Sequence, residues 1–128
     1  MGNREKTEGF EQLEVWERSI DIAVDIYKLT NSFPKSEIYS LINQMRRASS
    51  SISANIAEGY GRHGYKEKLQ FYKIANGSLL ETKSFCYLAN RLEYISQSQL
   101  EDIIVSFISI QKMINALIRS VRNNNENC

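Results

Sequence analysis

The sequence is poor in the residues that interrupt helices. Only one proline and six glycines occur among its 128 residues, whereas a hairpin-rich β protein or an unstructured segment needs many of both. A chain of this length, 42% of it hydrophobic, can bury one core but is too short for two. We therefore expect a single domain that is mostly helical.

Neither sign of charge is in clear excess. Sixteen basic and fifteen acidic residues leave a formal charge of +1, so no overall field points to nucleic acid or to a membrane surface, and any basic site must be local. The N-terminus lacks the apolar core of a signal peptide, and no apolar run approaches the roughly 20 residues of a membrane span. We expect a cytoplasmic protein without a membrane partner.

Residues that carry catalysis or bind metals are scarce. The two cysteines, Cys86 and Cys128, are too few for a disulfide framework. The single histidine, His63, cannot supply the paired Glu-x-x-His motifs of a di-iron bundle, and a general base would need partners that the spacing does not place. We predict no enzymatic activity, no catalytic residue, no metal and no cofactor.

Four segments with helical apolar spacing are separated by short polar breaks. Long helices joined by short connections predict an all-α fold, an antiparallel up-down-up-down four-helix bundle. We place the bundle domain at residues 10–122, with a flexible N-terminus at 1–9 and a polar C-terminal tail at 123–128.

The first helix is expected from Phe10, and it carries two apolar stripes where a surface helix needs one. The two stripes are Leu13, Trp16, Ile20, Ala23 or Val24, and Tyr27, and on a neighbouring face Val15, Ile22, Ile26, Leu29 and Phe33. Such a helix is either central or in contact with another subunit.

The second helix is expected to start between Pro34 and Glu37 and to end near Gly59, where a left-handed glycine cap is available. Its inward stripe is Ile38, Leu41, Ile42, Met45, Ala48, Ile52 and Ile56. Small residues dominate its second half, which predicts that a neighbouring helix approaches closely.

The third helix is expected over Tyr65–Tyr94, with a heptad-like inward seam. The seam is Phe71, Ala75, Ser78, Thr82, Phe85, Ala89 and Leu92, and a semi-apolar outer stripe is Leu69, Tyr72, Leu80 and Tyr87. A monomer has little use for that outer stripe.

The fourth helix is expected to begin with a capping box at Ser98 and Glu101. Its inward residues are Leu100, Ile103, Ile104, Phe107, Ile110, Ile114, Leu117, Ile118 and Val121.

Polar residues at the margins of the predicted core need partners. Arg47 and Glu58 lie eleven residues apart on the second helix, about 16 Å along its axis, so they cannot pair with each other. We expect Arg47, Asn55, Glu58 and Glu81 to form polar networks between helices or subunits. The alternative is that some of them face a ligand.

A basic run surrounds the junction of the second and third helices. It comprises Arg62, His63, Lys66, Lys68 and Lys73, interleaved with Tyr60, Tyr65 and Tyr72. Cations beside aromatic rings suit phosphate contact and base stacking. Together with Arg46 and Arg47, the basic run forms our candidate nucleic-acid-binding residues; the alternative is a solvated face.

Linked blocks along the second and third helices carry a family resemblance. They are Gln44–Ala48, Ser51-Ile52, Asn55–Gly59, Gly61-Arg62, Phe71, Ile74-Ala75, Gly77-Ser78 and Glu81. The chain resembles the bacterial four-helix-bundle proteins encoded in 23S ribosomal RNA intervening sequences, from about Phe10 to Val121. It is also similar to the accessory variability determinant of diversity-generating retroelements.

The resemblance implies a bundle that assembles as a ring-shaped homopentamer. The retroelement determinants bind nucleic acid and a reverse transcriptase through a basic surface, and the family offers no catalytic residues. Our leading hypothesis is a non-enzymatic oligomeric protein that contacts RNA. The alternative is a protein-interaction or retroelement-accessory scaffold without nucleic-acid binding.

Overall fold

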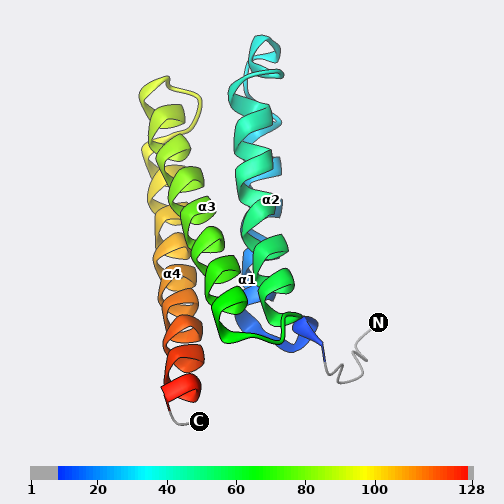
Figure 1. Cartoon of the computed structure of the whole chain (residues 1–128). Coiled ribbons are helices and arrows are strands. Elements are labelled where there is room, and N and C mark those ends of the chain that lie inside the picture. Colours follow the sequence, from blue (N-terminus) through cyan, green and yellow to red (C-terminus); the bar gives the residue numbers. More distant parts are fainter. Residues whose placement is uncertain (1–8, 127–128) are drawn as a thin grey trace, which may run out of the picture.

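The computed structural model describes residues 9–126, and every regular element in this part of the chain is a helix (Figure 1). It contains four long helices, α1 (Glu14–Thr30), α2 (Leu41–Tyr60), α3 (Tyr65–Arg91) and α4 (Gln97–Glu126), and two 3-10 turns, η1 (Phe10–Gln12) and η2 (Lys35–Glu37). The predicted all-helical fold class and its four helices are confirmed.

The four helices enclose one core. α2 packs against α1 and α3, and α4 packs against α3 and α1. Figure 1 shows the α1–α2 and α3–α4 connections at one end of the bundle and the α2–α3 connection at the other. All four helices contribute to the largest fully buried side chains, which include Ile22, Ile26, Met45, Ile52, Ile56, Tyr72, Leu79, Phe107, Ile110 and Ile114.

α1 turns mainly the second of its two apolar stripes to the core, while Leu13, Trp16 and Ala23 of the first stripe lie at the edge of the core. Ile22 and Ile26 are buried, whereas Ile20, Val24 and Tyr27 of the first stripe stay at least 36% exposed. The buried face also includes Ser19 and Thr30, whose hydroxyls donate to backbone oxygens one turn earlier. The spacing of apolar residues in the sequence does not identify these two positions as buried, because serine and threonine are polar. The helix begins at Glu14 rather than Phe10, because η1 and the extended Leu13 precede it.

The predicted start of the second helix is wrong. Pro34 leads into the single turn η2, and α2 begins only at Leu41. Ile38, which we placed on the inward stripe, precedes the helix and is 49% exposed.

Gly59 marks a close approach of α2 to α3. A Cβ at Gly59 would lie 2.6 Å from Cε1 of Tyr72. The predicted left-handed cap is wrong, because no glycine in residues 9–126 has a positive φ and α2 continues to Tyr60. Glycine is therefore required here for space rather than for backbone freedom.

The buried face of α3 is wider than the predicted seam. Tyr72, Leu79 and Cys86 are at most 1% exposed, whereas Leu92 of the seam is 44% exposed. α3 packs against α2 on one flank and α4 on the other, so two parallel rows of side chains are covered. Burial raises the pKa of the Cys86 thiol to about 12, as expected for an inert core cysteine.

The turn from α3 to α4 has a defined cap at each helix end. Glu93 has a φ of 65°, and the amide of Tyr94 donates to the carbonyl of Ala89, which is a Schellman-type ending. The capping box is formed by Ser96 and Gln99, with Gln99 N donating to Ser96 Oγ at 3.1 Å and Ser96 N donating to Gln99 Oε1 at 2.8 Å. The predicted box at Ser98 and Glu101 is therefore wrong by two residues.

α4 contains a long apolar stretch. Its stretch Gln97–Asn124 is long and apolar enough to cross a membrane by length and composition, contrary to our expectation from the sequence. Core helices of soluble proteins pass the same test, and Phe107, Ile110 and Ile114 of α4 are buried in the bundle. The helix continues to Glu126, into the segment that we expected as a polar tail.

Candidate nucleic-acid interface

Arg46 binds the end of α1. Its Nε donates to Thr30 Oγ1 at 2.9 Å, its Nη2 donates to Asn31 Oδ1 at 3.0 Å, and the guanidinium lies 4.7 Å from the ring centroid of Tyr27. A cation is favourable at this position because the last carbonyls of a helix carry a partial negative charge. Arg46 thus joins α2 to α1.

Arg47 points the other way, towards α3. Its Nη2 donates to Glu81 Oε2 at 2.7 Å and to Gln44 Oε1 at 3.1 Å. Both members of the ion pair are about half exposed, so the pair contributes modestly to stability. The structure thus brings Arg47 and Glu81 together between α2 and α3.

Asn55 and Glu58 make separate contacts. Asn55 Nδ2 donates to the backbone oxygen of Ser51 at 2.8 Å and to its Oγ at 2.9 Å, and Ser51 Oγ lies 3.0 Å from Ser78 Oγ on α3. Glu58 pairs with Arg62 one turn later. The four residues of the predicted network therefore lie along α2 and α3 in three groups rather than in one.

Arg62 and Lys68 are held against the protein. Arg62 lies 4.8 Å from the ring centroid of Phe71 as well as pairing with Glu58. Lys68 Nζ donates to the carbonyl oxygen of Tyr60 at 2.8 Å and to that of Gly59 at 3.3 Å. Lys68 therefore caps the C-terminal end of α2, and burial lowers its pKa.

His63, Lys66 and Lys73 are exposed, and none of them has a hydrogen bond or ion pair with another described residue. The tyrosines of the basic run are less accessible than we predicted. Tyr72 is 1% exposed, and the hydroxyl of Tyr60 accepts a hydrogen bond from Gln12 while its ring lies beside Lys68. Tyr65 remains accessible at 38%, so a row of stacking aromatics is not available.

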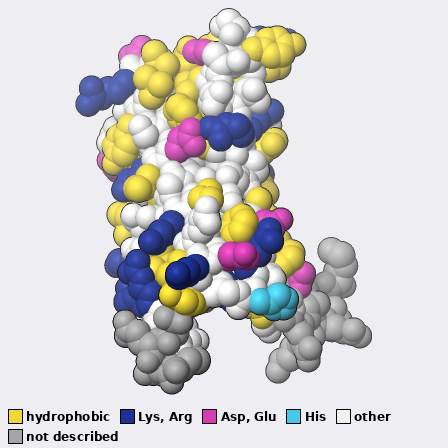
Figure 2. Space-filling view, viewed as in Figure 1, with side chains coloured by type: hydrophobic (Ala, Val, Ile, Leu, Met, Phe, Trp, Pro, Cys, Tyr) yellow, Lys and Arg dark blue, Asp and Glu magenta, His cyan; other side chains and the backbone are white. Residues whose placement is uncertain are grey.

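Our prediction from the sequence did not include three cationic residues of α4. Lys112, Arg119 and Arg122 are separated by seven and three residues, which places them along one side of the helix, and all three are exposed. Figure 2 shows Lys and Arg side chains gathered near the end of the bundle that carries the α2–α3 connection. The spacing on the predicted fourth helix was the signal that could have identified them.

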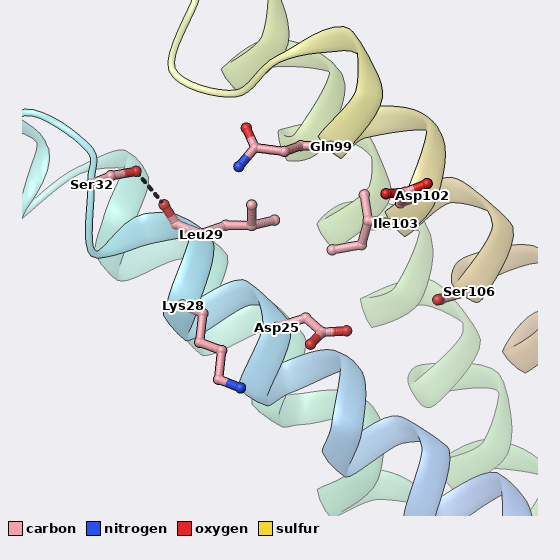
Figure 3. A pocket seen from close by; sticks show the side chains of 8 residues that line it. All are labelled: Asp25, Lys28, Leu29, Ser32, Gln99, Asp102, Ile103 and Ser106. Atoms are coloured by element: carbon pink, nitrogen blue, oxygen red, sulfur yellow. Dashed lines mark hydrogen bonds between the residues drawn. The ribbon is translucent and has the colours of Figure 1, made fainter.

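The opposite part of the molecule contains an acidic groove between α1 and α4. A cavity of about 370 Å³ is lined by Asp25, Lys28, Leu29, Ser32, Gln99, Asp102, Ile103 and Ser106. Figure 3 shows Leu29 of α1 pointing towards Ile103 of α4, with Asp25 beside them. Burial, with a smaller contribution from Asp21, raises the pKa of Asp25, and Lys28 partly opposes this shift.

The groove does not provide a metal site. Within residues 9–126 no group of three or more His, Cys, Asp or Glu side chains is arranged to hold a metal ion. The lining of the groove contains hydroxyl, amide and carboxylate side chains and one lysine, and neither cysteine nor histidine.

Comparison with known proteins identifies the family. The family model described as 23S rRNA-intervening sequence protein matches residues 11–116. The chain belongs to the 23S rRNA-intervening sequence protein family. The resemblance to this family is thus confirmed, while the similarity to the retroelement determinants stays a prediction.

This intervening-sequence protein also has a solved structural relative. It is similar to a protein of unknown function from the S23 ribosomal protein family of Bacteroides thetaiotaomicron, known from a crystal structure. The two share 27% identity and a TM-score of 0.76, over 82% of this chain and 95% of the other. No curated protein matches this chain.

Proposed function

We propose that this intervening-sequence protein is a non-enzymatic, homo-oligomeric scaffold that binds RNA through one end of its bundle. We define the basic end as the exposed residues Lys66 and Lys73 in the first three turns of α3 and Lys112, Arg119 and Arg122 in the second half of α4. The observation that carries the proposal is that these five cations make no hydrogen bond or ion pair within the described residues. Four of the seven cationic residues that we first selected are instead engaged inside the protein.

The chemistry of the basic end favours contact with phosphates. Lysine and arginine side chains supply charge-assisted donors to a nucleic-acid backbone. Stacking of unpaired bases needs exposed rings, and Tyr72 is buried while Tyr60 is engaged with Lys68. We therefore infer a preference for structured RNA, held through its backbone, over an extended single strand.

We also infer that the bundle is antiparallel in up-down-up-down order and that it assembles, as the family resemblance implies, into a homopentamer in the cytoplasm. The short α2–α3 and α3–α4 connections support the antiparallel order. The exposed apolar residues of α1, α3 and α4 support the assembly. A ring would repeat the basic end in every subunit and would strengthen its field.

A gel-shift experiment with an RNA hairpin at low ionic strength tests the RNA-binding part. The proposal predicts a shifted band that weakens as salt is added, because counterions are released when phosphates are neutralised. No salt-sensitive shift would contradict it.

A second candidate function is a protein-interaction or retroelement-accessory scaffold that does not bind nucleic acid. The exposed apolar side chains favour it, since Val105 is 68% exposed and Tyr39 is 92% exposed. An assembly in solution that leaves the RNA hairpin unshifted would support this candidate. A monomer would contradict the assembly that both candidates share.

A further inference from the structure

The outward face of α1 is apolar, with Asp21 and Asp25 on the side towards α4 and Arg46 of α2 over the ring of Tyr27 on the other side. Ile20, Val24 and Tyr27 follow at steps of four and three residues, so they form one stripe on the helix, and they are 36%, 45% and 46% exposed. α1 also carries four carboxylates against two cations. We call Ile20, Val24, Tyr27 and the neighbouring Asp21 the α1 face.

The outward face of α3 and α4 is apolar with a basic border. Leu80 and Tyr87 on α3 are 46% and 47% exposed, and Val105 and Ile108 on α4 are 68% and 43% exposed. We call these four residues the α3–α4 face.

Cations continue the rows of the α3–α4 face. Lys66 and Lys73 precede Leu80 and Tyr87 at seven-residue steps, and Lys112 follows Ile108 by one turn. α3 as a whole carries five cations against two carboxylates. The apolar face therefore borders the basic end directly.

The two faces cannot meet within one chain. α1 packs against α2 and α4 but makes no contact with α3, so the α1 face and the outer side of α3 lie across the bundle from each other. Both faces are apolar in the middle, and α1 and α3 have opposite net charge, since carboxylates outnumber cations by two on α1 and cations outnumber carboxylates by three on α3. A second copy of this chain therefore offers each face the partner that it lacks.

We propose that the α1 face of one copy docks on the α3–α4 face of the next copy. The proposal deepens the proposed function, on whose homo-oligomer it rests, by naming the two surfaces that join. Because the joined faces differ, the contact is head-to-tail, and each added copy leaves one free face at either end until the assembly closes into a ring.

The test uses one substitution on each face and a matched control. Val24→Asp places a carboxylate in the α1 face, and Val105→Asp places one in the α3–α4 face opposite the net negative charge of α1. The control is Ile74→Asp, because Ile74 is 44% exposed but shares its flank of α3 with Ser78 and Glu81, which contact α2. Circular dichroism checks that each variant is folded.

Sedimentation velocity then measures the mass of each protein. We expect the wild-type chain and Ile74→Asp to assemble, and Val24→Asp and Val105→Asp each to sediment as 14.8 kDa monomers. A mixture of the two monomeric variants retains one intact pair of faces, so it forms a 1:1 dimer and nothing larger.

Three outcomes would contradict the inference in distinguishable ways. A monomeric wild-type chain would overturn the proposed oligomer itself. A wild-type assembly that survives both Val24→Asp and Val105→Asp would overturn only the choice of faces. Two monomeric variants that form no dimer when mixed would overturn the head-to-tail arrangement.

Discussion

Gly59 lies where α2 and α3 come closest, and its missing side chain permits that approach. An added Cβ would lie 2.8 Å or less from two ring carbons of the buried Tyr72. Both helices would have to move, or the tyrosine ring would have to leave its place in the core. Gly59 is thus required by the packing of α2 against α3.

The substitution Gly59→Ala is expected to lower the free energy of unfolding by about 1–3 kcal/mol, the usual cost of overpacking a core. Urea denaturation at a fixed protein concentration measures the change. Gly77→Ala is the matched control, because Gly77 lies inside α3 with nothing within 4 Å of an added Cβ. It should gain about 0.5–1 kcal/mol from higher helix propensity. Equal effects at the two sites would contradict the close packing at Gly59.

Asp25 reports on the acidic groove. Burial raises its pKa above the ordinary value of 3.8, so the folded state binds the proton more tightly than the unfolded chain does. Stability from this group therefore falls as pH rises from the ordinary pKa through the raised one. Above that window an ionised carboxylate is held near Asp21 and beside Asp102 of α4.

The substitution Asp25→Asn should raise the midpoint of thermal unfolding at pH 7 and leave it nearly unchanged at pH 3, where Asp25 itself is protonated. Differential scanning calorimetry at both pH values measures the two midpoints. Loss of the attraction to Lys28 opposes the gain but is the smaller effect. A lower midpoint at pH 7 would show that the carboxylate stabilises the groove.

At the scale of the helices, the apolar pattern of α4 was sufficient to predict its inward face. Its buried residues repeat without a polar interruption, from Leu100 to Ile118. The inward face of α1 was harder to predict, because two of its six buried residues, Ser19 and Thr30, are polar. We placed Tyr72 on the outer stripe of the third helix, but it is buried. The reason is that α3 packs against two neighbouring helices, which cover two adjacent rows of its side chains.

The N-terminal cap of α4 illustrates a choice that sequence alone left open. Both Ser96-x-x-Gln99 and Ser98-x-x-Glu101 match the pattern of a capping box. The left-handed Glu93 ends α3 and sets where the chain can turn again. The two serines therefore make a direct test.

Ser96→Ala is expected to cost about 1 kcal/mol of stability, as is typical for loss of an N-cap. Ser98→Ala should change stability by less than about 0.5 kcal/mol, because it lies on the helix surface. Thermal melts of the two variants, followed by circular dichroism, measure the difference. The reverse order would favour the cap predicted from the sequence.

The side-chain contacts of the candidate site residues are set by how the helices pack in the whole molecule. The spacing of Arg46 and Arg47 on one helix could not reveal that one binds α1 and the other α3. Nor could it reveal that Lys68 caps α2. The basic end became visible only when the start of α3 and the end of α4 were placed at the same end of the bundle (Figures 1 and 2).

Removal of two cations from the basic end should weaken RNA binding in a defined way. The double substitution Lys66→Gln with Lys73→Gln should reduce the salt dependence by roughly two phosphate contacts, since each contact contributes about 0.7–0.9 to the logarithmic slope. The control is Lys35→Gln with Arg91→Gln, because these exposed cations lie near the opposite end of the bundle. The control should match the wild-type chain.

Fluorescence anisotropy of a labelled RNA hairpin, titrated with the wild-type protein at several salt concentrations, tests the central claim most directly. The proposed function predicts binding at low salt whose logarithm of affinity falls linearly with the logarithm of salt concentration, with a slope that corresponds to several phosphates. Absence of binding at low salt, or an affinity that does not change with salt, would contradict it.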